Sequence, residues 1–249
     1  MSDVATPLTA TTSSDTPASK SLGARAIGVI FSPRQTYADV AAHPRILGAM
    51  VLVLIISVAA STAFLMTEVG KDALFDQQIR TMESWGFRIT DQMYDRMESQ
   101  LAYAPYSNAG LILVVFPIVW AAIAGVIMGV FSLAMGGTAT YKQVYAIVTH
   151  SAILIALQQL FISPLNYARE AMSSPTTLAI FFPFLDEMTF LARLLGGIDL
   201  FFIWLIINLA IGVGVLYKRK TAPIAIGMLM FYLSIVLIVA AIRTALSGA

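Results

Sequence analysis

Five long apolar stretches follow one another along the chain, and shorter polar segments separate them. The five lie at 46–66, 109–135, 144–165, 198–217 and 221–242. A helix rises about 1.5 Å per residue, so about twenty apolar residues cross the roughly 30 Å of a bilayer's hydrocarbon core. The pattern therefore predicts an all-α fold, a polytopic integral membrane bundle of five transmembrane helices. This membrane domain extends over 46–245, with amphipathic interfacial helices beside it.

Two segments precede the first span, and they differ in composition. Residues 1–21 are rich in Ser, Thr, Ala, Asp and Pro and hold almost no large apolar side chain, which predicts a disordered tail. They also lack the basic start and apolar core of a secretory signal. Residues 22–45 predict an interfacial amphipathic segment. Ser32 and Pro33 begin a helix there, Gln35 completes a capping box, and Pro44 ends the helix.

Three arginines in this segment allow two interpretations. Arg25, Arg34 and Arg45 are expected to face anionic lipid headgroups, where a basic residue contributes about 1 kcal/mol. Alternatively, the segment is a short helix that caps the bundle and carries ordinary flanking charges. The two interpretations are compatible, and the sequence leaves both open.

The two long loops between spans are also expected to hold structure. Apolar residues recur at helical spacing in both halves of the loop 67–108, and a Trp-Gly-Phe break at 85–87 separates the halves. Thr90 followed by Asp91 begins the second half, so two amphipathic helices are predicted. The second loop contains an apolar run at 178–185 that is too short to span and includes a proline. An interfacial or re-entrant segment is expected there.

Basic residues in the short connections favour one orientation in the membrane. The tight turn Lys218-Arg219-Lys220 and the basic entry to the first span predict the same side, because Lys and Arg concentrate in cytoplasmic loops. The N-terminus is therefore expected in the cytoplasm and the C-terminus outside.

Polar residues inside the spans are the candidates for a functional site, because their burial in hydrocarbon is costly. His150 and Gln158 lie in the third span and Asn208 lies in the fourth. They are expected to form a polar seam between two helices. The seam is interpreted either as interhelical hydrogen bonding or as a pathway for protons or a small solute.

Small residues form a stripe along the second span. Ala121, Gly125 and Gly129 recur every four residues, a pattern that lets two helix backbones approach closely. The partner helix is expected within the same chain, although a helix of another chain would fit the pattern equally. The stripe is a candidate helix-packing surface.

Composition narrows the chemistry. Hydrophobic residues make up 58% of the chain and charged residues 12%, whereas a soluble domain carries about 25% charged residues. The net charge of +1 argues against nucleic acid as a partner. The chain has no cysteine, which excludes disulfides and thiolate metal sites, and its two histidines are too few for a histidine-built metal centre. No catalytic residue, metal site or cofactor is predicted, and the expected partners are membrane lipids, another membrane protein or a second copy of the chain.

Two stretches resemble a known family. They are Ile30-Phe31-Ser32-Pro33-Arg34-Gln35-Thr36-Tyr37 with the following His43-Pro44-Arg45, and Gly136-Gly137-Thr138-Ala139-Thr140-Tyr141 leading to Tyr145 and His150. The chain resembles the bacterial branch of the Yip (Ypt-interacting protein) family, whose five spans match the predicted five. The resemblance implies a membrane fold and a membrane location, which for the bacterial branch is expected to be the bacterial inner (cell) membrane. Eukaryotic relatives are implied to bind prenylated Rab-type GTPases through a longer N-terminus; GTPase binding is not expected here, because the chain lacks an Asp-Leu-Tyr-Gly-Pro stretch.

Together these features predict a non-enzymatic Yip-type integral membrane protein that acts as a membrane-organising or partner-binding scaffold. The alternative is a transporter or channel component that uses the polar seam of His150, Gln158 and Asn208.

Overall fold

A computed structural model of the chain describes residues 19–247. The predicted tail therefore lies outside the described residues up to residue 18. The described part is helical, and it contains one isolated β-bridge, between Thr177 and Asp199, but no strand. The predicted all-α fold is confirmed.

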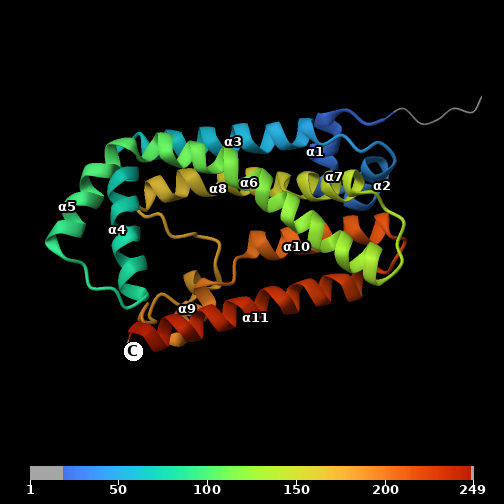
Figure 1. Cartoon of the computed structure of the whole chain (residues 1–249). Helices are drawn as coiled ribbons and strands as arrows, with labels where there is room; N and C mark the ends of the chain where they lie inside the picture. Colours follow the sequence, from blue (N-terminus) through green and yellow to red (C-terminus); the bar gives the residue numbers. More distant parts are fainter. Residues whose placement is uncertain (1–18, 248–249) are drawn as a thin grey trace, which may run out of the picture.

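Long helices run back and forth between two ends of the molecule (Figure 1). The described part of the chain begins with α1 at one end of the bundle, and α11 finishes at the other end (Figure 1). The helices of the bundle are α3 (Leu47–Leu65), α6 (Ala104–Met128), α7 (Tyr141–Ser151), α8 (Ile153–Ala168), α10 (Leu200–Leu216) and α11 (Thr221–Ser247).

Four helical runs among the described residues are long and apolar enough to cross a membrane. They are Leu47–Leu65, Asp91–Ala134, Tyr141–Ala168 and Thr221–Ser247. The fourth predicted span corresponds to α10, which has 17 residues. Its length lies at the lower limit for a transmembrane helix, because about 17 residues rise roughly 25 Å.

The second and third spans differ in detail from the sequence prediction. The second is the C-terminal part of a longer helical run, in which α5 (Asp91–Gln100) and a short 3₁₀ turn, η1 (Leu101–Tyr103), lead into α6. The run ends in a π-helix, η2 (Gly129–Ala134). The third span is broken at Ala152 into α7 and α8, although neither glycine nor proline stands at the break.

The predicted helices of the first long loop are present. α4 (Glu68–Ser84) crosses the end of the bundle that holds the C-terminus, and α5 lies beside it (Figure 1). Thr90 caps α5 as predicted, because its hydroxyl accepts a hydrogen bond from the backbone N–H of Met93. In the second loop the apolar run forms a short 3₁₀ helix, η3 (Leu178–Phe181), ahead of α9 (Phe190–Gly196).

A helical hairpin closes the opposite end of the bundle. It consists of α1 (Leu22–Phe31) and α2 (Pro33–Ala42), and it packs against α7 and α10. α2 begins at Pro33 as predicted, but the side chain of Ser32 makes no capping hydrogen bond. The predicted capping box is therefore wrong.

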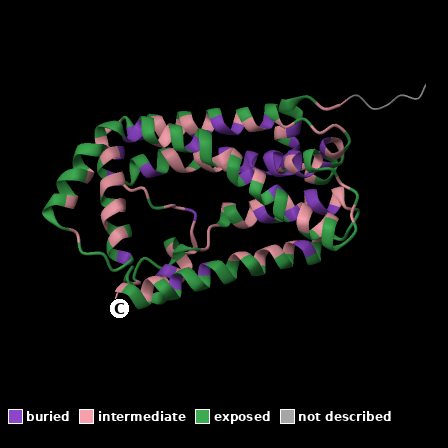
Figure 2. Cartoon of the chain, viewed as in Figure 1, coloured by how far each residue is buried: buried purple, intermediate pink, exposed green. Residues whose placement is uncertain are grey.

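Burial is concentrated where this α1–α2 hairpin meets α7 and α10. Figure 2 shows buried residues clustered there, while α6 and α11 are exposed over much of their length. Tyr37 and Val40 of the hairpin have no exposed surface. Gly212 of α10 allows this close contact, since a Cβ atom there would lie 2.5 Å from Cγ2 of Ile147. The α1–α2 hairpin, which precedes the first span, is thus part of the core.

Candidate functional site

Three polar side chains meet in the core where the α1–α2 hairpin enters the bundle. We call Tyr37, Ser151 and Asn208 the junction cluster. The Tyr37 hydroxyl donates a hydrogen bond to Oδ1 of Asn208, and it lies 2.7 Å from Oγ of Ser151. The Asn208 amide donates in turn to the carbonyl of Val29, at 2.9 Å. The cluster therefore joins α2, the end of α7, α10 and α1.

The three side chains of the junction cluster are buried, and the two hydroxyl groups each have one proton to donate. Tyr37 gives its single hydroxyl proton to Asn208, so its contact with Ser151 requires the Ser151 proton. The carbonyl of Ile147 also accepts that proton, with an Oγ–O distance of 2.9 Å. Burial raises the pKa of the Tyr37 phenol well above its ordinary value. The phenol consequently stays neutral near pH 7, and the cluster holds helices together without carrying charge.

A second polar contact fastens the α1–α2 hairpin internally. Nε of Arg25 lies 2.8 Å from Oδ2 of Asp39, and Nη2 of Arg25 donates to the carbonyl of His43 at 3.1 Å. Arg25 is 2% exposed. Arg25 therefore does not face lipid headgroups, and the capping interpretation of the segment describes it better. Arg34 and Arg45 are exposed.

The carboxyl of Asp39 is stabilised in its ionised form. Burial alone would raise the pKa of Asp39, but the backbone N–H of Lys20 and the guanidinium of Arg25 outweigh it. The pKa of Asp39 is therefore held below its ordinary value. The ion pair is formed throughout the neutral range and ties α1 to α2.

His150 is buried close to the junction cluster but bonds within its own helix. Its Nδ1 lies 2.7 Å from the carbonyl oxygen of Ala146. A carbonyl only accepts, so Nδ1 carries the proton in the neutral ring and Nε2 is left as an acceptor. Nε2 is buried and has no hydrogen-bond partner among residues 19–247. His150 is 1% exposed.

Gln158 belongs to a different polar group, at the start of α10. Its amide donates to Oδ1 of Asp199 at 3.1 Å. The other carboxylate oxygen of Asp199 accepts hydrogen bonds from the hydroxyls of Ser174 at 2.7 Å and Thr176 at 2.6 Å. Oδ1 also accepts from the backbone N–H of Phe201, which caps α10. Asp199 thus connects α8, the second long loop and α10.

The three residues of the predicted seam are distributed over separate contacts. No hydrogen bond joins His150, Gln158 and Asn208 to one another within the described chain. Tyr37 bonds Asn208, and Ser151 bonds Tyr37. Neither was predicted as a site residue. Tyr37 lies outside the spans, and a serine inside a span is common enough to carry little signal.

The small-residue stripe of the second span is open. A Cβ atom built at Gly125 or Gly129 would meet nothing within 4 Å apart from its own helix. Ala121 is contacted through its backbone, because its carbonyl accepts from the hydroxyl of Tyr141 at 2.9 Å. No helix among residues 19–247 therefore packs closely on the two glycines.

Residues with metal-binding side chains do not gather anywhere in the described part of the chain. In residues 19–247 there is no group of three or more His, Cys, Asp or Glu residues able to hold a metal ion. The polar contacts described above are hydrogen bonds and one buried ion pair. They fasten helices to one another.

These features define an all-helical integral membrane protein with a helical hairpin seated in one end of its bundle. The sequence model of the Yip1 domain matches residues 27–243, so the chain belongs to the Yip1 domain family. Yip proteins are a family of non-catalytic membrane proteins. The match begins inside α1 and ends inside α11, so it includes part of α1, all of α2 and most of the membrane bundle. No curated protein and no solved structure matches the chain.

Proposed function

We propose that the protein is a non-catalytic scaffold of the bacterial inner membrane, which organises the membrane around it or holds a partner protein. The junction cluster is the observation that carries this proposal. Its side chains join four helices, and each of their contacts ends on another part of the same chain. Polar groups engaged in this way stabilise a fixed arrangement of helices and leave no free group to pass a solute along.

The outward faces of the bundle support the same function. Side chains such as Leu111, Ile118 and Val126 of α6 are at least 60% exposed. Exposed apolar surface of this kind suits lipid or the helix of another membrane protein. Of the open glycines of the small-residue stripe, Gly125 lies on α6 and Gly129 begins η2, which continues it, so a second helix could approach closely there.

One observation favours the alternative, a transporter or channel component. Nε2 of His150 is buried without a partner, and unpaired ionisable groups inside a bundle are typical of proton pathways. A flux measurement separates the two functions. The protein is reconstituted into liposomes with a pH-sensitive dye inside, and proton entry is followed after a pH jump. The scaffold function predicts the same rate with and without protein.

His150→Leu provides the matched variant for this assay. If wild-type protein increases proton entry and His150→Leu abolishes the increase while eluting normally from a sizing column, the scaffold proposal is wrong. Asn208→Leu is less informative alone, because it also breaks the junction cluster and is expected to impair folding.

Partner binding is tested by placing a photo-activated crosslinking side chain at Gly125, in the open stripe. Met230 of α11 is the control position, because it is 65% exposed on a helix without such a stripe. A protein adduct at Gly125, and not at Met230, is expected. Its mass distinguishes a second copy of the chain from another membrane protein. Equal labelling at both positions would remove the support that the stripe gives to the scaffold.

The proposed orientation has the N-terminus in the cytoplasm and the C-terminus outside. Its support is the exposed basic residues at the end of the bundle that holds the α1–α2 hairpin, Arg34, Arg45, Lys142 and the turn Lys218-Arg219-Lys220. Reporter fusions after Ala249 and within residues 67–108 test the orientation. A cytoplasmic signal from either fusion would overturn it.

A further inference from the structure

A basic hollow lies between α2 and the turn that connects α10 to α11. Its volume is about 470 Å³, and it opens to the surface at the end of the bundle that holds the α1–α2 hairpin. The hollow is lined by Arg34, Ala38, Gly214, Val215, Lys218, Arg219 and Lys220. Four of these seven residues are cationic, and none is acidic. They come from two parts of the chain that only the fold brings together.

The charge of the basic hollow is not balanced by the described protein. None of its four cationic side chains forms an ion pair with any residue in 19–247. Within residues 19–247 these side chains form one hydrogen bond, in which Nη2 of Arg219 donates to the carbonyl of Met135 at 3.3 Å. Four cationic side chains around one hollow create a positive potential there, so an anion in the hollow would be favourable.

The backbone of the turn brings the cations together at a conformational cost. The N–H of Arg219 donates to the carbonyl of Gly214 at 2.8 Å, and the N–H of Lys218 donates to that of Val215 at 3.3 Å. This pair of bonds is a Schellman motif, and Lys218 occupies its left-handed position with φ of 53°. Glycine is the usual residue there, because a side chain costs about 1–2 kcal/mol in this conformation. Lysine at this position adds a charge to the hollow at the expense of local stability.

The same two bonds reduce a repulsive feature. The carboxyl end of a helix carries partial negative charge on its unpaired carbonyl groups, which disfavours anions. At the end of α10 the carbonyls of Gly214 and Val215 are both occupied by the turn. The wall of the basic hollow is consequently dominated by side-chain cations.

We infer that the basic hollow binds the phosphate group of an anionic membrane lipid. It lies where two apolar helices, α10 and α11, meet at the end of the bundle, the level at which lipid headgroups are found. Arginine and lysine are the side chains that bind phosphate best, arginine through its planar guanidinium and lysine as a point charge. The site is compatible with a scaffold and with a transporter, so it does not depend on the function proposed above.

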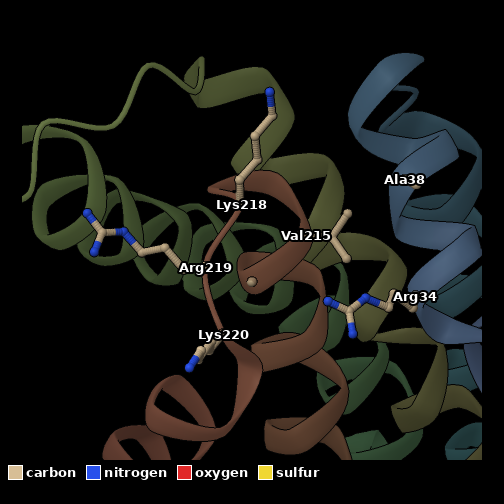
Figure 3. Close-up of a pocket in the computed structure, with 7 residues that line it drawn as sticks. Arg34, Ala38, Val215, Lys218, Arg219 and Lys220 are labelled. Carbon is tan, nitrogen blue, oxygen red and sulfur yellow. The ribbon is translucent and has the colours of Figure 1, made fainter.

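The arrangement of the side chains favours a lipid headgroup over a free phosphate ion. Figure 3 shows Arg34 extending from α2 toward the turn, whereas Lys218, Arg219 and Lys220 extend from the turn in different directions. A free phosphate is held best by donors that converge on it. Cations that spread along an open surface instead suit headgroups presented side by side by a bilayer.

Lipid binding to the full chain in a neutral detergent tests the site. Phosphatidylglycerol and phosphatidylcholine are titrated separately, and bound lipid is counted by native mass spectrometry. Phosphatidylglycerol is expected to bind at least tenfold more tightly. Arg34→Gln should weaken its binding about fivefold, the equivalent of the roughly 1 kcal/mol that one basic residue contributes near an anionic surface. Arg34→Gln leaves unchanged the turn Lys218-Arg219-Lys220, whose charges support the proposed orientation in the membrane.

Two control variants distinguish binding in the basic hollow from nonspecific attraction to the other cations at this end of the bundle. Arg45→Gln and Lys142→Gln each remove an exposed cation outside the hollow, and both should leave binding within about twofold of wild type. If these variants weaken phosphatidylglycerol binding as much as Arg34→Gln does, or if Arg34→Gln has no effect, the site is rejected.

Lys218→Gly separates binding from folding. Glycine relieves the left-handed backbone at this position, so the thermal midpoint should stay equal or rise while phosphatidylglycerol binding falls about fivefold. A variant that is destabilised and binds less would contradict the proposal.

In a final experiment, inorganic phosphate at millimolar concentration competes with the lipid. Full displacement would show a free-phosphate site and overturn the lipid assignment.

Discussion

Tyr37 donates a buried hydrogen bond to Asn208, although 171 positions separate the two residues in the chain. Tyr37 belongs to a helix that precedes the first span, and Asn208 lies in the middle of α10. The bond fastens a segment that hydropathy places outside the membrane to the interior of the bundle. The α1–α2 hairpin is consequently a structural part of the membrane domain.

Tyr37→Phe should destabilise the protein by about 1–3 kcal/mol. The substitution keeps the ring in its packed position but removes the proton that Oδ1 of Asn208 accepts, and a buried acceptor without a donor is costly. Thermal unfolding in mild detergent measures the effect. Tyr106→Phe is the control, because Tyr106 is 67% exposed, and it should change stability by less than about 0.5 kcal/mol. Equal midpoints for the two variants would contradict the role of the junction cluster.

Asp39→Asn should reduce stability at neutral pH and should change its response to acid. The folded protein holds the pKa of Asp39 below its unfolded value, so the ionised carboxyl stabilises the fold above the ordinary pKa of about 4. That stabilisation is lost as the pH falls through the lower, folded pKa. At pH 7 the variant leaves Arg25 buried without its partner, at a cost of about 3 kcal/mol.

Unfolding midpoints of wild type and Asp39→Asn, measured from pH 7 down to pH 3, test this linkage. The difference between the two proteins should be largest at neutral pH and should narrow as the pH falls. Glu68→Gln serves as a control, because Glu68 is 83% exposed and its pair with Lys71 is on the surface. A constant difference across the whole range would show that the charge of Asp39 is unimportant.

Gly212→Ala and Gly125→Ala should shift stability in opposite directions. At Gly212 the new methyl group would lie 2.5 Å from Cγ2 of Ile147 and 3.2 Å from the Tyr37 ring, and overpacking typically costs about 1–3 kcal/mol. At Gly125 the methyl group meets open space, and alanine favours a helix over glycine by up to about 1 kcal/mol. Thermal unfolding of the two variants side by side provides the measurement. A loss at both positions would show that the stripe is packed after all.

Arg193→Met and Arg243→Met form a second matched pair. Arg193 is 8% exposed, and its Nε and Nη1 have no partner among residues 19–247, so methionine should raise stability by about 1–3 kcal/mol. Arg243 instead bonds Oγ of Ser84 and lies 5.9 Å from the ring of Trp85, so its replacement should lower stability by about 1–2 kcal/mol. Chemical denaturation in detergent compares them. A stability loss for Arg193→Met would contradict the cost assigned to its unpaired guanidinium.

The spans were predictable because hydrocarbon imposes one requirement, about twenty apolar residues in a row. The amphipathic helices of the first long loop were predictable for a similar reason, since helical spacing and a capping threonine are local. The break at Ala152 was not predictable, because no glycine or proline marks it. Local patterns therefore located the elements well and their interruptions poorly.

Contacts between distant segments could not be derived in the same way. Hydropathy identified Asn208 as a costly residue to bury, but it contains no information on which side chain satisfies the amide. The partner, Tyr37, lies on a short helix that sequence alone placed at the interface. The sequence likewise suggests that Arg25 is a surface cation, because its partner Asp39 lies on another helix and approaches it only in the folded protein. The small-residue stripe shows where a helix can approach, and only the fold shows that none of this chain's described helices does.

The seat of the α1–α2 hairpin sets an order of assembly. A ribosome makes this segment first, but Ser151 and Asn208, which hold it, are made only when the third and fourth spans emerge. Until then Val29, Tyr37 and Val40 lack the complete core that buries them in the folded protein. A segment that precedes all the spans thus receives its last hydrogen-bond partner from the fourth of them, and a chain truncated before α10 lacks the side chain that Tyr37 bonds.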